Sequence, residues 1–213
     1  MTDKAEKILF LKPFEIDSSN NSLRSVWKSI SRILKKTDGA FESGLFCSIY
    51  NSSKYGFVSY SAWDSRDSFM EAAKENIVLR YHISKNGDSG KSYSKFLYKV
   101  TEQEKVKGKS VGTELYLILF IEKNKAHGSE IISYWKSLRD HFKNKNLLRE
   151  IYLCKSIHQK AKYNYIILGK IKIENKDIKD INSFMDDERF KKIKIKDYHF
   201  SIYNKNNLKV SLN

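Results

Sequence analysis

The sequence is poor in residues that often reveal a protein's class. It has two cysteines, one proline and nine glycines among 213 residues. A secreted domain of this size usually carries more cysteines, so we expect Cys47 and Cys154 to be reduced, with a disulfide between the two halves as the alternative. The sequence has no CxxC pair and no His/Cys cluster with zinc spacing, so no structural metal is expected.

Long apolar runs are also missing. No window approaches the roughly 18 apolar residues that a membrane-spanning helix needs, and residues 1–7 (MTDKAEK) lack the apolar stretch of a signal peptide. We expect a cytoplasmic protein with no membrane partner. Hydrophobic residues still make up 40% of the chain, with 12 Phe, 13 Tyr and 3 Trp, which is enough to build packed cores.

Arginine is scarce in a chain that is otherwise strongly basic. The formal net charge is +15, but only seven of the 40 basic residues are arginines. Nucleic-acid sites depend on Arg for bidentate contacts and stacking. The excess of Lys, with abundant Asn and Ile, is more typical of an AT-rich genome, so nucleic acid is not the expected partner.

A weak internal repeat organises the chain. Trp27 in SVWKS matches Trp135 in SYWKS at an offset of 108 residues, and Lys54-Tyr55 matches Lys162-Tyr163 at the same offset. The shared order of such matches favours duplication over chance. We expect the two tryptophans to pack in equivalent cores.

Each half predicts the element order βαββαβ from its apolar periodicity. The first helix is expected to begin at Ser22 and to place Leu23, Val26, Ile30, Ile33 and Leu34 on one face, and the second is expected to be capped by Asp64 or Ser65. The other expected elements are strands at 7–16, 45–50, 55–63, 92–100, 115–121, 148–157, 163–173 and 198–203, and helices at 129–142 and 178–191.

This order is that of a ferredoxin-like module, a four-stranded sheet with helices on one face. Two modules can bury their bare faces against each other, gaining roughly 25 cal/mol per Å² of apolar area. We therefore expect an α+β fold of two ferredoxin-like modules, residues 1–103 and 112–213 with a linker at 104–111. They would pack sheet to sheet as an intramolecular, pseudo-dimeric α/β barrel, either monomeric or forming a homodimer.

A local pattern follows the strand at 55–63. Residues 63–69 (WDSRDSF) fit W-[DE]-S-x-[DE]-x-F, and FEID at 14–17 and TDGAF at 37–41 precede them. On these residues the stretch from about 7 to 100 resembles the antibiotic-biosynthesis-monooxygenase family. The resemblance implies a dimeric α/β barrel with a pocket between sheet and helices. It also implies a monooxygenase-like oxidoreductase that binds an aromatic, polyphenolic or haem-like molecule, either without a cofactor or, alternatively, with haem.

Alternation along this strand puts Tyr55, Phe57, Ser59, Ser61 and Trp63 on one face. If that face looks at the helices, the resemblance makes it the wall of the pocket, with Tyr55, Phe57 and Ser61 in contact with the substrate. Trp63 would stack on a flat ring, and Ser59, where cofactor-free members commonly carry Asn, would donate a hydrogen bond to a substrate oxygen. The alternative is that Trp63 only packs the strand–helix junction.

Two further side chains are candidates in the first half. The resemblance gives His82 the position of the histidine that binds iron in haem-degrading members, and a neutral imidazole can also accept a proton. The strand at 7–16 holds no Asn and Ala72 replaces a second Trp of those members, so no cofactor is the first expectation. Arg80 and Lys12 could anchor an anionic substrate.

Two other functions fit the same element order. RNA-recognition motifs share it, and residues 54–60 (KYGFVSY) resemble their RNP1 strand; such a module exposes the aromatic face of its sheet, which a barrel would bury. The third reading is a pseudoenzyme that binds a ligand without catalysis.

Overall fold

The computed structural model describes residues 7–15, 20–49, 53–76, 79, 93–106, 113–122, 128–159, 161–173 and 198–205. The first half contains β1 (Ile8–Glu15), α1 (Asn20–Leu34), β2 (Ala40–Ser48), β3 (Tyr55–Trp63), α2 (Arg66–Glu75), the 3-10 helix η1 (Tyr93–Phe96) and β4 (Leu97–Lys105). The second half contains β5 (Thr113–Glu122), α4 (Gly128–Asn144), β6 (Leu148–Ser156), β7 (Tyr163–Ile173) and β8 (Tyr198–Lys205).

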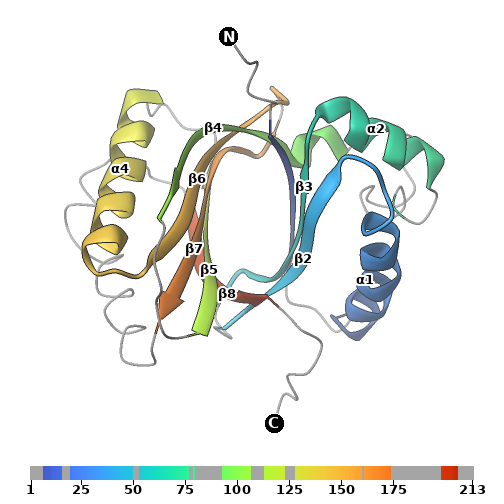
Figure 1. Cartoon of the computed structure of the whole chain (residues 1–213), viewed down its shortest axis with the longest axis horizontal. Helices are drawn as coiled ribbons and strands as arrows, with labels where there is room; N and C mark the ends of the chain where they lie inside the picture. Colours follow the sequence, from blue (N-terminus) through green and yellow to red (C-terminus); the bar gives the residue numbers. More distant parts are fainter. Residues whose placement is uncertain are drawn as a thin grey trace.

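The eight strands form one closed antiparallel barrel in the order β1-β3-β2-β8-β5-β7-β6-β4. Within each half the strands have the ferredoxin-like order, and the halves join where β2 pairs with β8 and β4 pairs with β6. Figure 1 shows the barrel in the centre, with α1 and α2 on one side and α4 on the other. The expected α+β barrel of two sheets is thereby confirmed.

The boundaries of several elements differ from those expected. β3 and β7 match, but β4 begins at Leu97 and continues to Lys105, paired with β6 as far as Glu150. Helix α1 begins at Asn20, so Ser22 lies inside it and cannot be its cap. Ser65 does cap α2, because its Oγ accepts from the N–H of Ser68 at 3.0 Å. The helix expected at 178–191 lies outside the described residues, as does most of the linker expected at 104–111, of which residues 104 and 105 belong to β4.

Helix α1 faces the sheet with a different stripe from the one expected. Trp27, Ile30 and Leu34 are buried, whereas Val26 is 38% exposed. These three share a face at intervals of three and four residues, and the large indole of Trp27 takes the place expected for Val26. Trp135 on α4 is equally buried, so the prediction that both tryptophans pack in their cores is confirmed.

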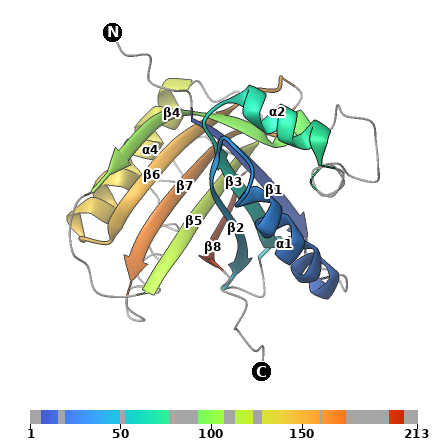
Figure 2. The ribbon, with the colours of Figure 1, turned by 45° about the vertical axis from the view of Figure 1, so that its right-hand side comes forward.

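The barrel separates three apolar clusters. The interior cluster lies inside the strands, the first outer cluster lies between β1–β3–β2 and helices α1 and α2, and the second outer cluster lies under α4. Figure 2 shows how the strands curve between these helices. Cys154 belongs to the interior cluster and Cys47 packs against the first outer cluster, so the two thiols lie on opposite faces of the sheet and form no disulfide.

The interior cluster is unusually rich in tyrosine. Three of its phenols donate hydrogen bonds to glutamates. Tyr60 donates to Glu42, Tyr116 to Glu114 and Tyr152 to Glu150. Burial raises the pKa of these phenols and the carboxylates raise it further, so they remain protonated donors. Lys205, Lys170 and Lys105 pair with the same glutamates, which balances their charge.

No helix in the described parts of the chain is long and apolar enough to cross a membrane.

Gly39, between α1 and β2, provides a test of this packing. Its φ is +79°, and a Cβ there would lie 2.5 Å from the Cβ of Ser68 in α2. We expect Gly39→Ala to lower the free energy of unfolding by about 2 kcal/mol or more, because the left-handed conformation and the clash both oppose the new methyl group.

Gly169→Ala is the matched control, to be compared in urea denaturation. A Cβ at Gly169 would make ordinary contacts, the nearest at 3.6 Å from Leu117 Cβ. Equal effects of the two substitutions would contradict the close approach of α2 to the turn at Gly39.

Candidate functional site

Strand β3 presents four of the predicted residues to the helices. Phe57 and Trp63 belong to the first outer cluster, and Ser59 and Ser61 alternate between them on the same face. In the register with β1, Ser59 lies opposite Lys12 and Ser61 lies opposite Phe10. The face that sequence alternation assigned to a pocket wall is therefore the helix-covered face.

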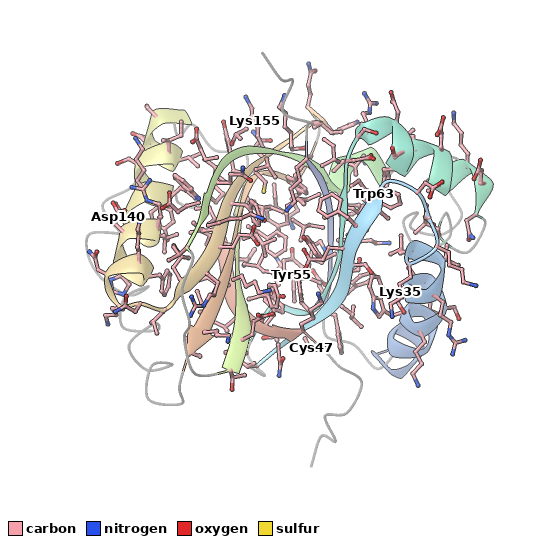
Figure 3. The ribbon with its side chains drawn as sticks, in the orientation of Figure 1. Lys35, Cys47, Tyr55, Trp63, Asp140 and Lys155 are labelled. Carbon is pink, nitrogen blue, oxygen red and sulfur yellow. The ribbon has the colours of Figure 1, made fainter. Side chains whose placement is uncertain are left out.

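Tyr55 does not share this face, and its predicted place is wrong. The register with β1 shifts where Glu15 pairs with Tyr55 and Phe14 pairs with Phe57, which leaves Gly56 as an extra residue. Such a bulge reverses the alternation. Tyr55 lies inside the barrel, in the position labelled in Figure 3, where its hydroxyl contacts that of Tyr163.

Trp63 is fully buried at the end of β3, beneath α2 (Figure 3). Its Nε1–H donates to Ser61 Oγ at 2.8 Å, and the ring meets Phe69 of α2 edge-on with centroids 5.3 Å apart. These contacts fix the indole at the strand–helix junction. Packing of that junction, the simpler of the two readings of Trp63, is therefore one role that the side chain performs.

Ser59 differs from Ser61 because its hydroxyl has no partner among the described residues. It is fully buried, and its Oγ makes no hydrogen bond to any described residue. A buried hydroxyl without a partner costs about 1–3 kcal/mol relative to one that is bonded. Such a group requires an explanation, and binding of a ligand atom is one of the few available.

Lys12 lies beside Ser59 and is the only lysine among the buried residues of the described chain. It is 7% exposed, and its ammonium nitrogen lies 5.1 Å from the centroid of the Phe14 ring and 5.9 Å from that of Phe96. Those distances fit cation–π contacts, which stabilise a charge held in apolar surroundings. Lys12, Ser59 and Ser61 together form what we call the polar trio.

The second half provides an internal comparison for the polar trio. In the pairing of β5 with β7, Leu115 lies opposite Ile171 as Ile8 lies opposite Trp63. The equivalents of Lys12, Ser59 and Ser61 are then Leu119, Ile167 and Gly169, in that order. The same sheet positions, under the same kind of helix, are thus apolar in one half and polar in the other.

His82 and Arg80 lie outside the described residues, so their predicted roles stay predictions. Haem would need an axial ligand on the helix-covered face of the first half, and the buried side chains described there include no imidazole. In the described part of the chain, no three His, Cys, Asp or Glu side chains lie together as metal ligands. The described residues of this face therefore supply no imidazole for haem, and His82, the predicted ligand, is not among them.

The reading as an RNA-recognition motif needs an exposed sheet face. Tyr60 and Val58, which would belong to that face, are buried inside the barrel. The surface on which bases would stack is therefore covered by the other half of the chain.

Comparisons with known proteins support this architecture. The sequence matches no family model and no curated protein. Among solved structures, a presumed monooxygenase from Fusobacterium nucleatum is 13% identical with a TM-score of 0.59 over 95% of this chain and 93% of the other. An anthrone oxidase-like protein is 10% identical with a TM-score of 0.58, covering 95% and 91%. A mutant chlorite dismutase from Candidatus Nitrospira defluvii is 10% identical with a TM-score of 0.53, covering 95% and 93%.

This chain has the fold of the dimeric α/β barrels. Each match spans more than nine-tenths of both chains, so both halves of the barrel have counterparts in these structures. At such low identities the likeness concerns the fold.

The burial of Lys12 in this α/β barrel was not predicted from the sequence. The signal was present: in Leu9-Phe10-Leu11-Lys12 the lysine falls within an apolar strand, on the side of Phe10. A lysine is usually solvated at such a position when one face of the sheet is bare. In the structure the helices cover the face of β1 that carries Lys12. The sequence pattern alone could not show which face of β1 the helices cover.

The two serines of the trio should respond differently to truncation. We expect Ser59→Ala to leave the free energy of unfolding unchanged or to raise it by about 1 kcal/mol, because an unbonded buried hydroxyl is removed. Ser61→Ala should lower it by about 1 kcal/mol, because the buried indole N–H of Trp63 loses its acceptor. Urea denaturation measures both, and a Ser59→Ala loss as large as that of Ser61→Ala would contradict the assignment.

Proposed function

We propose that the chain binds a small aromatic molecule on the helix-covered face of its first half and oxygenates it without a cofactor. The observation that carries the proposal is the polar trio. Lys12, Ser59 and Ser61 occupy positions that carry no polar side chain in the second half, so barrel closure does not by itself require polar groups there. Buried polar groups that the fold does not need are expected where a ligand is bound.

The surroundings of the trio suit a flat, apolar ligand. Phe10 and Phe57 flank the serines on neighbouring positions of β1 and β3, and Phe96 lies beside Lys12. Aromatic side chains favour stacked or edge-on contact with a planar ring. A hydroxyl such as that of Ser59 can donate to a carbonyl or phenolic oxygen of that ring.

Oxygenation of such a ligand needs no external reductant if the substrate itself supplies the electrons. In an anthrone, the ring methylene would lose two hydrogens and gain a carbonyl oxygen from O₂, and the second oxygen atom would leave as water. The structural likeness to an anthrone oxidase-like protein supports the choice of this substrate class for a first test. The protein's part would be to exclude water and to stabilise the deprotonated ring.

Oxygen uptake with dithranol, a dihydroxyanthrone, tests this function. We expect the protein to raise O₂ consumption above the autoxidation measured without it, and Ser59→Ala to reduce the enzymatic rate about tenfold, as loss of one hydrogen bond in the transition state would. Ile167→Val, at the equivalent position of β7, is the control and should leave the rate unchanged.

Two results would contradict the proposal in different ways. An equal effect of Ser59→Ala and Ile167→Val would exclude β3 as the reaction site. If the protein binds dithranol but causes no oxygen uptake, it does not catalyse this oxidation. The alternative of a pseudoenzyme that binds a ligand without catalysis would then be favoured.

A further inference from the structure

We infer that the site takes its ligand as an oxygen anion, an ionised phenol or enol, and that Lys12 is the residue that selects it. The inference rests on the proposed site and names its ligand class. It concerns binding, so it can hold or fail independently of the oxygenation.

The position of Lys12 is the first step. It lies near the middle of β1, which is paired with β3 on one side, and its side chain is 7% exposed. The ammonium group lies against the rings of Phe14 and Phe96. A cation buried among aromatic groups interacts with a bound anion more strongly than it would in water, because the local dielectric is low.

The position of Ser59 is the second step. Directly opposed residues on antiparallel strands have Cβ atoms about 5 Å apart, and Ser59 lies opposite Lys12 on the helix-covered face. Its hydroxyl is buried and makes no hydrogen bond to a described residue. A hydroxyl and an ammonium at this spacing can both donate to one oxygen, and the bonds are stronger when that oxygen is charged.

The second half of the barrel shows that this pair of positions can be filled by apolar side chains. Leu119 and Ile167 form the equivalent pair, with the same register and with α4 covering them. Replacing such a pair by Lys and Ser gives up apolar burial and adds a desolvation penalty. The first half retains the polar pair in spite of this cost, as binding sites commonly do at the expense of stability.

The combination of these groups defines the ligand class. The cation and the hydroxyl favour a negatively charged oxygen, and the neighbouring Phe10 and Phe57 favour a flat apolar body attached to it. An ionised phenol or enol meets both requirements, whereas a neutral ether of the same ring meets only the second. Lys12 would therefore lower the pKa of the bound hydroxyl group.

Alizarin, a dihydroxyanthraquinone whose phenolate absorbs at longer wavelength than the phenol, is a suitable probe. We expect the full-length protein to bind it as the phenolate and to lower its apparent pKa by about one unit or more. Lys12→Met keeps the length of the side chain and removes the charge, so it should abolish the shift and weaken alizarin binding about tenfold to a hundredfold.

Three controls separate charge from packing. Leu119→Met places the same residue at the equivalent position of β5 without removing a charge. It should alter neither the spectrum of bound alizarin nor the affinity for alizarin. The dimethyl ether of alizarin cannot ionise, so its affinity should be the same for the Lys12→Met variant and the unaltered protein. The thermal unfolding midpoint of Lys12→Met should be no lower than that of the unaltered protein, because the equivalent residue Leu119 packs well without a charge.

The possible outcomes are distinct. Alizarin that quenches tryptophan fluorescence but keeps the spectrum of the neutral phenol would overturn the inference, as would an unchanged phenolate band in Lys12→Met. No binding of alizarin would overturn both the inference and the proposed site. A phenolate band lost in Lys12→Met, without oxygen uptake on dithranol, would support the inference and refute the oxygenase.

If Lys12→Met does not fold, Ser59→Ala provides the test. It should weaken binding of the phenolate several-fold more than binding of the dimethyl ether. Equal weakening of both ligands would overturn the inference.

Discussion

A four-stranded ferredoxin-like sheet has two edges with unpaired backbone groups and one face without helices, and neither can be left as it is in water. Here the pairing of β2 with β8 and of β4 with β6 satisfies both edges and brings the two bare faces together. The rest of the structure follows from this closure. It places the tyrosine-rich cluster inside the barrel, it leaves each helix layer outside, and it divides the apolar matter of the chain into three clusters.

The two outer clusters share a plan but differ in composition. Under α4 the equivalent sheet positions are leucine, isoleucine and glycine, and the buried Nε1 of Trp135 makes no hydrogen bond to a described residue. Under α1 and α2 the same positions include Lys12 and Ser59, and the hydroxyl of Ser59 makes no hydrogen bond to a described residue. The sheet face of the first half therefore buries a lysine and two serines at positions that carry no polar side chain in the second half.

Much of the fold could be predicted from the sequence because it depends on local patterns. The bounds of β3 and β7, the Ser65 cap and the packing of Trp27 and Trp135 follow from alternation, capping chemistry and periodicity. Tyr55 was assigned to the wrong face of the sheet, because the bulge at Gly56 turns the preceding side chain to the opposite face. Lys12 and Ser59 could be named as candidates, but their burial depends on the register of β1 with β3 and on helices distant in sequence. No local pattern contains that information.

Both halves of the barrel belong to a single chain, and this has a consequence for how the site can change. In a barrel assembled from two identical subunits every substitution appears twice, so a buried charge that improves one site also burdens the opposite one. In this chain a lysine can enter at position 12 while position 119 remains leucine. The stability lost in one half can then be compensated by better packing in the other. A continuous chain thus allows this barrel to carry a polar substitution in one half without the same substitution in the other.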